Sequence, residues 1–152
     1  NKIKFNLYGN VWKSQKKYYN YCKNFIVVNK IQNLKIKKFS NKIKNAYNNN
    51  DLLISTSKNE SMPLVICEAM SMSLPVLSTD AGDIKKFVNY KNTNAGFIIK
   101  DNKVKNFGNK IYTLSKNKSL YKKLSFNSRN IAKKKFNIKK YKLKLINLLN
   151  RL

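Results

Sequence analysis

Short apolar segments rich in β-branched residues alternate along the chain with longer segments in which apolar residues recur every three to four positions. The short segments predict strands at residues 3–8, 25–29, 51–56, 76–78 and 96–100. The longer segments predict helices at residues 11–23, 36–48, 63–72 and 83–89. Because alternating strands and helices form βα units, we expect an α/β fold with a Rossmann-like parallel sheet flanked by helices.

The pattern changes from residue 103 onward, where lysine-studded helical periodicity continues without a strand. We expect three C-terminal helices at residues 103–116, 118–135 and 138–151. No proline- or glycine-rich linker interrupts the chain, so we expect one domain over residues 1–152. The last helix is amphipathic. Its apolar stripe favours packing against the rest of the protein or a missing neighbour, and the alternative is a basic helix lying on a membrane.

The chain is strongly basic, with 33 lysines and arginines, 6 acidic residues and a formal net charge of +27. Only Arg129 and Arg151 are arginines, whereas arginine is preferred for bidentate contacts to phosphates and bases. The lysines are spread along the whole chain, and an A/T-rich genome would also produce the excess of Lys, Asn and Ile. The scarcity of arginine therefore argues against nucleic-acid binding as a function, whereas diffuse lysine is enough for attraction to an anionic membrane surface.

Several kinds of site are excluded by what the sequence contains. There is no histidine, and the two cysteines, Cys22 and Cys67, are far apart. We therefore expect no metal site, no Ser–His or Cys–His catalysis, and two reduced thiols of a cytosolic protein. No apolar run approaches the ~20 residues of a membrane span, and the first residues lack the apolar core of a signal peptide.

The acidic residues are confined to positions 51–101, and the only glutamates, Glu60 and Glu68, lie eight positions apart. Glu68 is the only ionisable residue of the predicted helix 63–72, which is apolar nearly all round and should be buried. An unpaired buried carboxylate is costly. We therefore expect Glu68 either to have a lysine partner or to face a cleft that hydroxyl donors can reach.

The start of the same helix is suited to an anion. The free N–H groups around Ser61 and Met62 can receive a phosphate, while carboxylates accept hydrogen bonds from sugar hydroxyls. Glu60, just before the helix, and Glu68, within it, can frame this terminus, which indicates a nucleotide sugar as ligand. The structural alternative is that Glu60 caps the helix and Glu68 forms an ion pair.

These residues also form a family pattern, in which two glutamates eight apart are followed by Ala69-Met70, Pro75-Val76 and Gly82. The pattern resembles the C-terminal, donor-binding domain of the family 4 retaining glycosyltransferases of the GT-B fold. The resemblance implies transfer of a sugar from a nucleotide diphosphate sugar to a glycan or lipid acceptor with retention. It implies no metal or other cofactor, and no catalytic residue that can be assigned within this chain.

The resemblance also implies roles for individual residues. The residues expected to bind the donor sugar are Glu60, Ser61, Met62 and Pro63. The residues expected to bind the nucleotide are Glu68, Leu64, Ser57, Lys30 and Ile31, the last two in a loop after the predicted strand 25–29.

The sequence departs from the family pattern where Ser61 and Ser73 replace glycines. The family's first strand, which supplies an arginine and a lysine for the diphosphate, and its N-terminal acceptor domain are expected outside this chain. We therefore expect the chain alone to be inactive and its partner domain to lie in the same or another chain. The alternatives are a donor-binding subunit of a split enzyme, or a degenerate relative that binds a partner or an anionic membrane. The expected location is cytoplasmic, peripheral at the inner membrane face.

Overall fold

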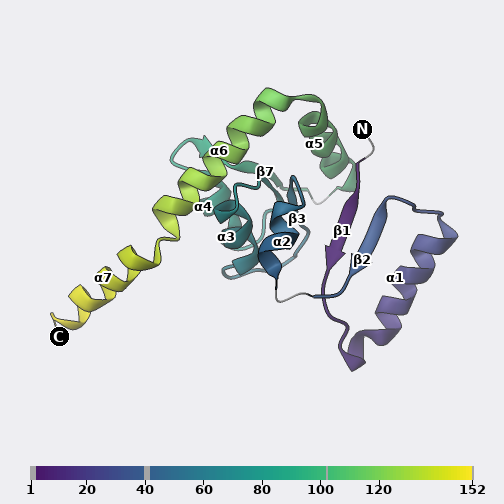
Figure 1. Cartoon of the computed structure of the whole chain (residues 1–152), viewed down its shortest axis with the longest axis horizontal. Helices are drawn as coiled ribbons and strands as arrows, with labels where there is room; N and C mark the ends of the chain where they lie inside the picture. Colours follow the sequence, from purple (N-terminus) through teal and green to yellow (C-terminus); the bar gives the residue numbers. More distant parts are fainter. Residues whose placement is uncertain (1–2, 40–41, 102, 152) are drawn as a thin grey trace. The chain divides into compact units, whose positions relative to one another are not determined.

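The computed structural model describes residues 3–39, 42–101 and 103–151. The chain forms two compact units, unit 1 (Asn1–Ile43) and unit 2 (Lys44–Leu152). Figure 1 shows the elements of both, coloured along the sequence. That the chain forms one domain stays a prediction.

Unit 1 is a βαβ unit. Strands β1 (Phe5–Tyr8) and β2 (Leu34–Lys37) are parallel, with Phe5 opposite Leu34. A short 3-10 helix, η1 (Lys13–Gln15), and helix α1 (Lys16–Val28) connect them. The predicted first strand and the helix after it are therefore confirmed.

Two predictions in this part of the chain are wrong. Residues 25–28 are the last turn of α1 rather than a strand. Cys22 and Ile26 are half-buried on one face of this helix, and this packing outweighs the preference of the β-branched residues for a strand. Most of the predicted helix 36–48 is also not helical. Leu34 and Ile36 alternate in burial with exposed lysines as β2, and only α2 (Ile43–Asn48) is a helix. Residues 40 and 41 of that prediction lie outside the described residues.

Unit 2 contains the parallel sheet and the C-terminal helices that the sequence predicts. Strands β3 (Leu53–Ser55), β4 (Val76–Thr79) and β7 (Gly96–Ile99) lie side by side in that order, all parallel. Helices α3 (Leu64–Ser71) and α4 (Ile84–Val88) follow the first two strands. The last strand leads into α5 (Val104–Lys116), α6 (Lys118–Lys135) and α7 (Ile138–Leu149).

The central strand β4 is buried on both faces, as expected for a parallel sheet between helices. Val76 packs in a cluster with Ile66 of α3 and Ile131 of α6. Leu77, on the opposite face, packs with Phe107 of α5. The period-two alternation of the strand therefore gives each layer of helices its own core.

A small antiparallel hairpin, β5 (Asn89–Tyr90) and β6 (Thr93–Asn94), was not predicted. Its two-residue turn places Lys91 and Asn92 at positive φ, as type I′ turns require. The hairpin leads directly into β7. Helix α6 is bonded to the hairpin by Asn127, which donates to the carbonyl of Asn94. It is also bonded to the segment before β4 by buried Ser128, which donates to the carbonyl of Leu74.

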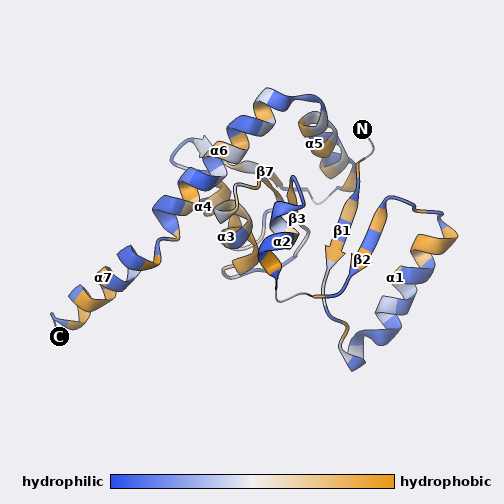
Figure 2. Ribbon diagram, in the orientation of Figure 1, coloured by the Kyte–Doolittle hydropathy of each residue, from blue (hydrophilic) through white to orange (hydrophobic). Residues whose placement is uncertain are grey.

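Helix α7 has no buried residue. Figure 2 shows its apolar and polar residues in alternating bands, and the exposed apolar side chains include Ile138, Tyr141, Leu145 and Leu148. The described helices include none that combines the length and the apolar character needed to cross a bilayer.

Candidate functional site

Two loops of unit 2 follow the carboxyl ends of neighbouring parallel strands, where ligands bind in open α/β sheets. Residues 56–63 follow β3 and carry Ser57 and Glu60, and residues 80–83 follow β4. The two loops are tied together. The Thr79 hydroxyl, at the end of β4, donates a hydrogen bond of 2.5 Å to the carbonyl of Ser57.

A second tie is steric. Gly82 has φ = 54°, and a Cβ at this position would overlap the backbone carbonyl oxygen of Glu60. Only glycine therefore allows the turn after β4 to approach the backbone of Glu60 this closely. The family pattern includes Gly82, and the structure gives it a physical role: it fixes the backbone of the first glutamate.

Helix α3 starts directly after the loop. Pro63 is its N-cap, with no side chain capping the first turn and no acidic residue within it. Proline fits here because the N–H that it lacks would have no partner within the helix. The backbone N–H of Ile66 donates to the carbonyl of Pro63 at 3.0 Å, which leaves the N–H groups of Leu64 and Val65 in this turn without a partner in the helix. That an anionic ligand binds here stays a prediction.

The prediction that α3 is buried all round is wrong. Ile66, Cys67, Ala69 and Met70 are buried, but Leu64 and Val65 are 67% and 47% exposed, and Glu68 is also exposed. Leu64, Val65 and Glu68 lie three and four positions apart and so share one face of the helix. This face is open on the surface next to the loop of Glu60, and it places the second glutamate where a ligand can reach it.

Glu68 is held by a tyrosine rather than a lysine. The Tyr47 hydroxyl, from α2, donates a hydrogen bond of 2.7 Å to Oε2 of Glu68. Burial raises the pKa of Tyr47, and the hydrogen bond to Glu68 raises it further. Burial also raises the pKa of the neighbouring Cys67 thiol, so this cysteine stays protonated at neutral pH. Tyr47 was not singled out from the sequence, because only the fold brings it to Glu68.

Lys30 and Ile31 are placed differently from the prediction. They lie in unit 1, after α1 and just before β2, so they follow a helix rather than a strand. Lys30 lines an open hollow of about 310 Å³ with Ile3, Gln32 and Asn33, at the amino ends of β1 and β2. They therefore do not lie in a loop after a strand, and their role in binding the nucleotide stays a prediction.

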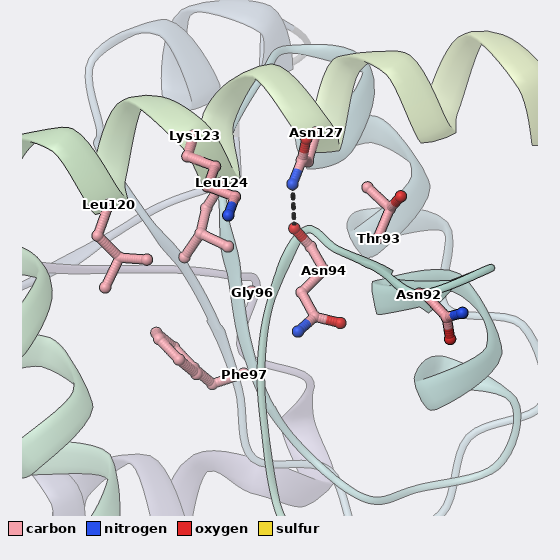
Figure 3. Close-up of a pocket in the computed structure, with 9 residues that line it drawn as sticks. All are labelled: Asn92, Thr93, Asn94, Gly96, Phe97, Leu120, Lys123, Leu124 and Asn127. Carbon is pink, nitrogen blue, oxygen red and sulfur yellow. Dashed lines mark hydrogen bonds between the residues drawn. The ribbon is translucent and has the colours of Figure 1, made fainter.

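Unit 2 also has a pocket of about 300 Å³ between the start of β7, the β5–β6 hairpin and α6, shown in Figure 3. Phe97 of β7 and Leu120 and Leu124 of α6 form its apolar part, while Asn94 and Asn127 contribute amides. It lies near the amino end of β7, so it is separate from the loops that carry the two glutamates.

The residues that the structure describes include no cluster of three or more His, Cys, Asp or Glu side chains that could hold a metal ion. That the site needs no metal or other cofactor stays a prediction from the family resemblance.

The fold and the strand-end loops define a class of protein, the GT-B glycosyltransferases. The C-terminal half of that fold accounts for the parallel sheet, the helices on both of its faces and the final helices. The chain belongs to the glycosyl transferases group 1 family, whose model matches residues 1–131. No curated protein matched the chain.

Solved structures share this fold at low sequence identity. The complex of Anabaena HepE with UDP has a TM-score of 0.91 and 22% identity, covering 99% of this chain and 41% of that one. Sucrose-phosphate synthase from Thermosynechococcus elongatus has a TM-score of 0.83 and 17% identity, covering 96% of this chain and 37% of that one. The C-terminal domain of a group 1 glycosyl transferase, LpcC of Francisella tularensis, has a TM-score of 0.73 and 18% identity, covering 84% and 66%. The chain thus spans about two fifths of the length of HepE.

Proposed function

We propose that this chain is the donor-binding part of a glycosyltransferase, which transfers a sugar from a nucleotide diphosphate sugar to a glycan or lipid acceptor with retention. One observation carries the proposal. The only two glutamates of a chain with net charge +27 are half-buried Glu60, in the loop after the carboxyl end of β3, and exposed Glu68, in helix α3 that follows this loop. The backbone of Glu60 is fixed by Gly82, and the carboxylate of Glu68 is held by Tyr47.

In this proposal each part of the surface binds one part of the donor. The carboxylate of Glu60 and the backbone of Ser61–Pro63 contact the sugar, and the open N–H groups at the start of α3 receive the diphosphate. Glu68 accepts from the ribose hydroxyls, with Leu64 and Ser57 beside it. The structures of HepE in complex with UDP and with UDP-glucose support UDP-glucose as the first donor to test.

Calorimetric titration of the 152-residue chain with UDP-glucose and with UDP tests these roles. Glu68→Ala should weaken both ligands about tenfold or more, because a hydrogen bond to a charged group is lost. Glu60→Ala should weaken UDP-glucose by a similar factor and leave UDP unchanged. Asp51→Ala is the matched control, since it removes an exposed carboxylate elsewhere in unit 2. Equal binding by wild type and both glutamate variants would contradict the proposal.

The partner of this surface is proposed to be an acceptor-binding domain, in the same chain or in a separate subunit of a split enzyme. The full length of HepE, of which this chain spans 41%, supports a second domain. With one wall of the cleft, the chain should bind donor but transfer no sugar. Sugar transfer to any acceptor by the isolated chain would contradict this part of the proposal.

A second candidate function, a degenerate relative that binds an anionic membrane, is favoured by α7. Its apolar residues are exposed, and Lys139, Lys140, Lys142 and Lys144 lie among them. Co-sedimentation with vesicles of neutral and of anionic lipid tests this function. Binding only to anionic vesicles, lost on deletion of residues 138–152, would support it and a cytoplasmic location at the inner membrane face. Binding that survives the deletion would contradict a role for α7.

A further inference from the structure

Tyr47 and Glu68 form an unusual pair for a chain so rich in lysine. Tyr47 is only 7% exposed, and its hydroxyl reaches Oε2 of the exposed Glu68 at 2.7 Å. The ion pairs found among the described residues join Lys86 to Asp83 and Lys103 to Asp101, and neither involves Glu68. The carboxylate of Glu68 is therefore held by a neutral donor.

A tyrosine partner leaves the carboxylate of Glu68 more available to a ligand than a lysine partner would. A lysine would neutralise the carboxylate and compete with a ligand for both oxygens. The tyrosine occupies one oxygen and leaves the charge and the other oxygen available for hydroxyl donors. The hydrogen bond also restricts the rotamers of Glu68 before a ligand binds. Ligand binding then costs less side-chain entropy, because Glu68 is already held in place.

We infer that Tyr47 is a positioning residue for nucleotide recognition, which holds Oε2 of Glu68 so that Oε1 accepts from the ribose hydroxyls of the donor. This inference rests on the proposed function, since it takes Glu68 to be the ribose-binding residue. It adds a residue from α2, 21 positions before Glu68, to the site. The alternative is that the same hydrogen bond only docks α2 on α3.

The test couples the protein substitution to the ligand hydroxyls. UDP and 2′,3′-dideoxy-UDP are titrated into the wild-type chain, Tyr47→Phe, Glu68→Ala and Tyr121→Phe. The Tyr121 variant is the matched control, because it removes the hydroxyl of a half-buried tyrosine elsewhere in unit 2. The measured quantity is the ratio of the two dissociation constants, which reports the contribution of the ribose hydroxyls alone.

Wild type and Tyr121→Phe should bind UDP about tenfold more tightly than the dideoxy analogue, because the analogue cannot donate to Glu68. In Glu68→Ala the ratio should fall to about one, and in Tyr47→Phe it should fall at least threefold, with the affinity for the dideoxy analogue unchanged. Loss of stability in Tyr47→Phe alone would not move this ratio, so thermal unfolding of each variant separates docking from positioning.

The outcomes that overturn the two claims differ. A Tyr47→Phe ratio equal to that of wild type, with the Glu68→Ala ratio reduced, overturns the positioning role and leaves the proposed function intact. Equal weakening of both ligands by Tyr47→Phe also overturns it. A wild-type ratio of about one, or no binding of UDP in the millimolar range, overturns the ribose-binding role of Glu68 itself.

Discussion

Replacing Gly82 with alanine tests whether the turn after β4 fixes the loop that carries Glu60. The residue has φ = 54°, and the added Cβ would overlap the carbonyl oxygen of Glu60. Both atoms are close to the backbone, so rotation of a side chain cannot relieve the overlap. The variant must therefore either shift the loop of Glu60 or rearrange the turn.

The size of the effect follows from three contributions. An L-residue in the left-handed region costs about 1–2 kcal/mol. Forcing an extra carbon into a filled space typically costs about 1–3 kcal/mol. The reduced freedom of the unfolded chain returns about 0.4–1 kcal/mol. We therefore expect Gly82→Ala to lower the free energy of unfolding by about 2–4 kcal/mol and to weaken UDP-glucose binding more than UDP binding.

Urea unfolding and donor titration measure these effects, and Gly108→Ala is the matched control. Gly108 lies inside α5, where a Cβ would meet no atom within 4 Å, so alanine there should stabilise the protein by about 0.5–1 kcal/mol. If Gly82→Ala unfolds at the same urea concentration as wild type and binds UDP-glucose equally well, then Gly82 does not fix the loop of Glu60.

Three further predictions concern single residues of unit 2. Thr79→Val removes the donor to the Ser57 carbonyl and should cost about 1–2 kcal/mol in urea unfolding; an unchanged free energy of unfolding would mean that water replaces the hydroxyl. The raised pKa of Tyr47 favours the neutral phenol in the folded state, so its contribution to stability is fully present below about pH 10 and is lost as the pH rises further. Wild type should therefore lose more stability than Tyr47→Phe between about pH 9 and pH 11, and parallel losses in urea unfolding would contradict this. Ser73→Gly should raise the free energy of unfolding by about 1 kcal/mol, because Ser73 has φ = 66°; no gain would show that the serine is not strained.

Local sequence was informative where burial and pattern agree. The strands β3, β4 and β7 are short apolar runs that are half-buried or buried in unit 2, and α3 starts one residue after Pro63. These features place Glu60 just before α3 and Glu68 within it from sequence alone. The exposure of this helix was not predictable, because an apolar composition does not reveal which face lacks a covering element.

Local sequence misled where another part of the fold decides the conformation. The β-branched run at residues 25–28 continues α1, because its packing follows the helical stripe of Cys22 and Ile26. The contacts of the site are also non-local. Tyr47 lies 21 positions from Glu68, and Thr79 lies 22 positions from Ser57, so no local pattern could have joined them.

The two serines that replace family glycines have different consequences. Ser73 ends α3 in a left-handed conformation, with the N–H of Leu74 bonded to the carbonyl of Ala69 at 2.9 Å, which is where glycine is preferred. Ser73 precedes the amino end of β4, away from the loop of Glu60, so its strained conformation lowers the free energy of unfolding. Ser61 is exposed and is not among the described residues with positive φ, so serine there carries no such strain. Its hydroxyl instead adds a hydrogen-bonding group on the surface where the donor sugar is proposed to bind. We therefore expect the serine at position 73 to lower stability, and the serine at position 61 to act on the proposed donor site rather than on the backbone.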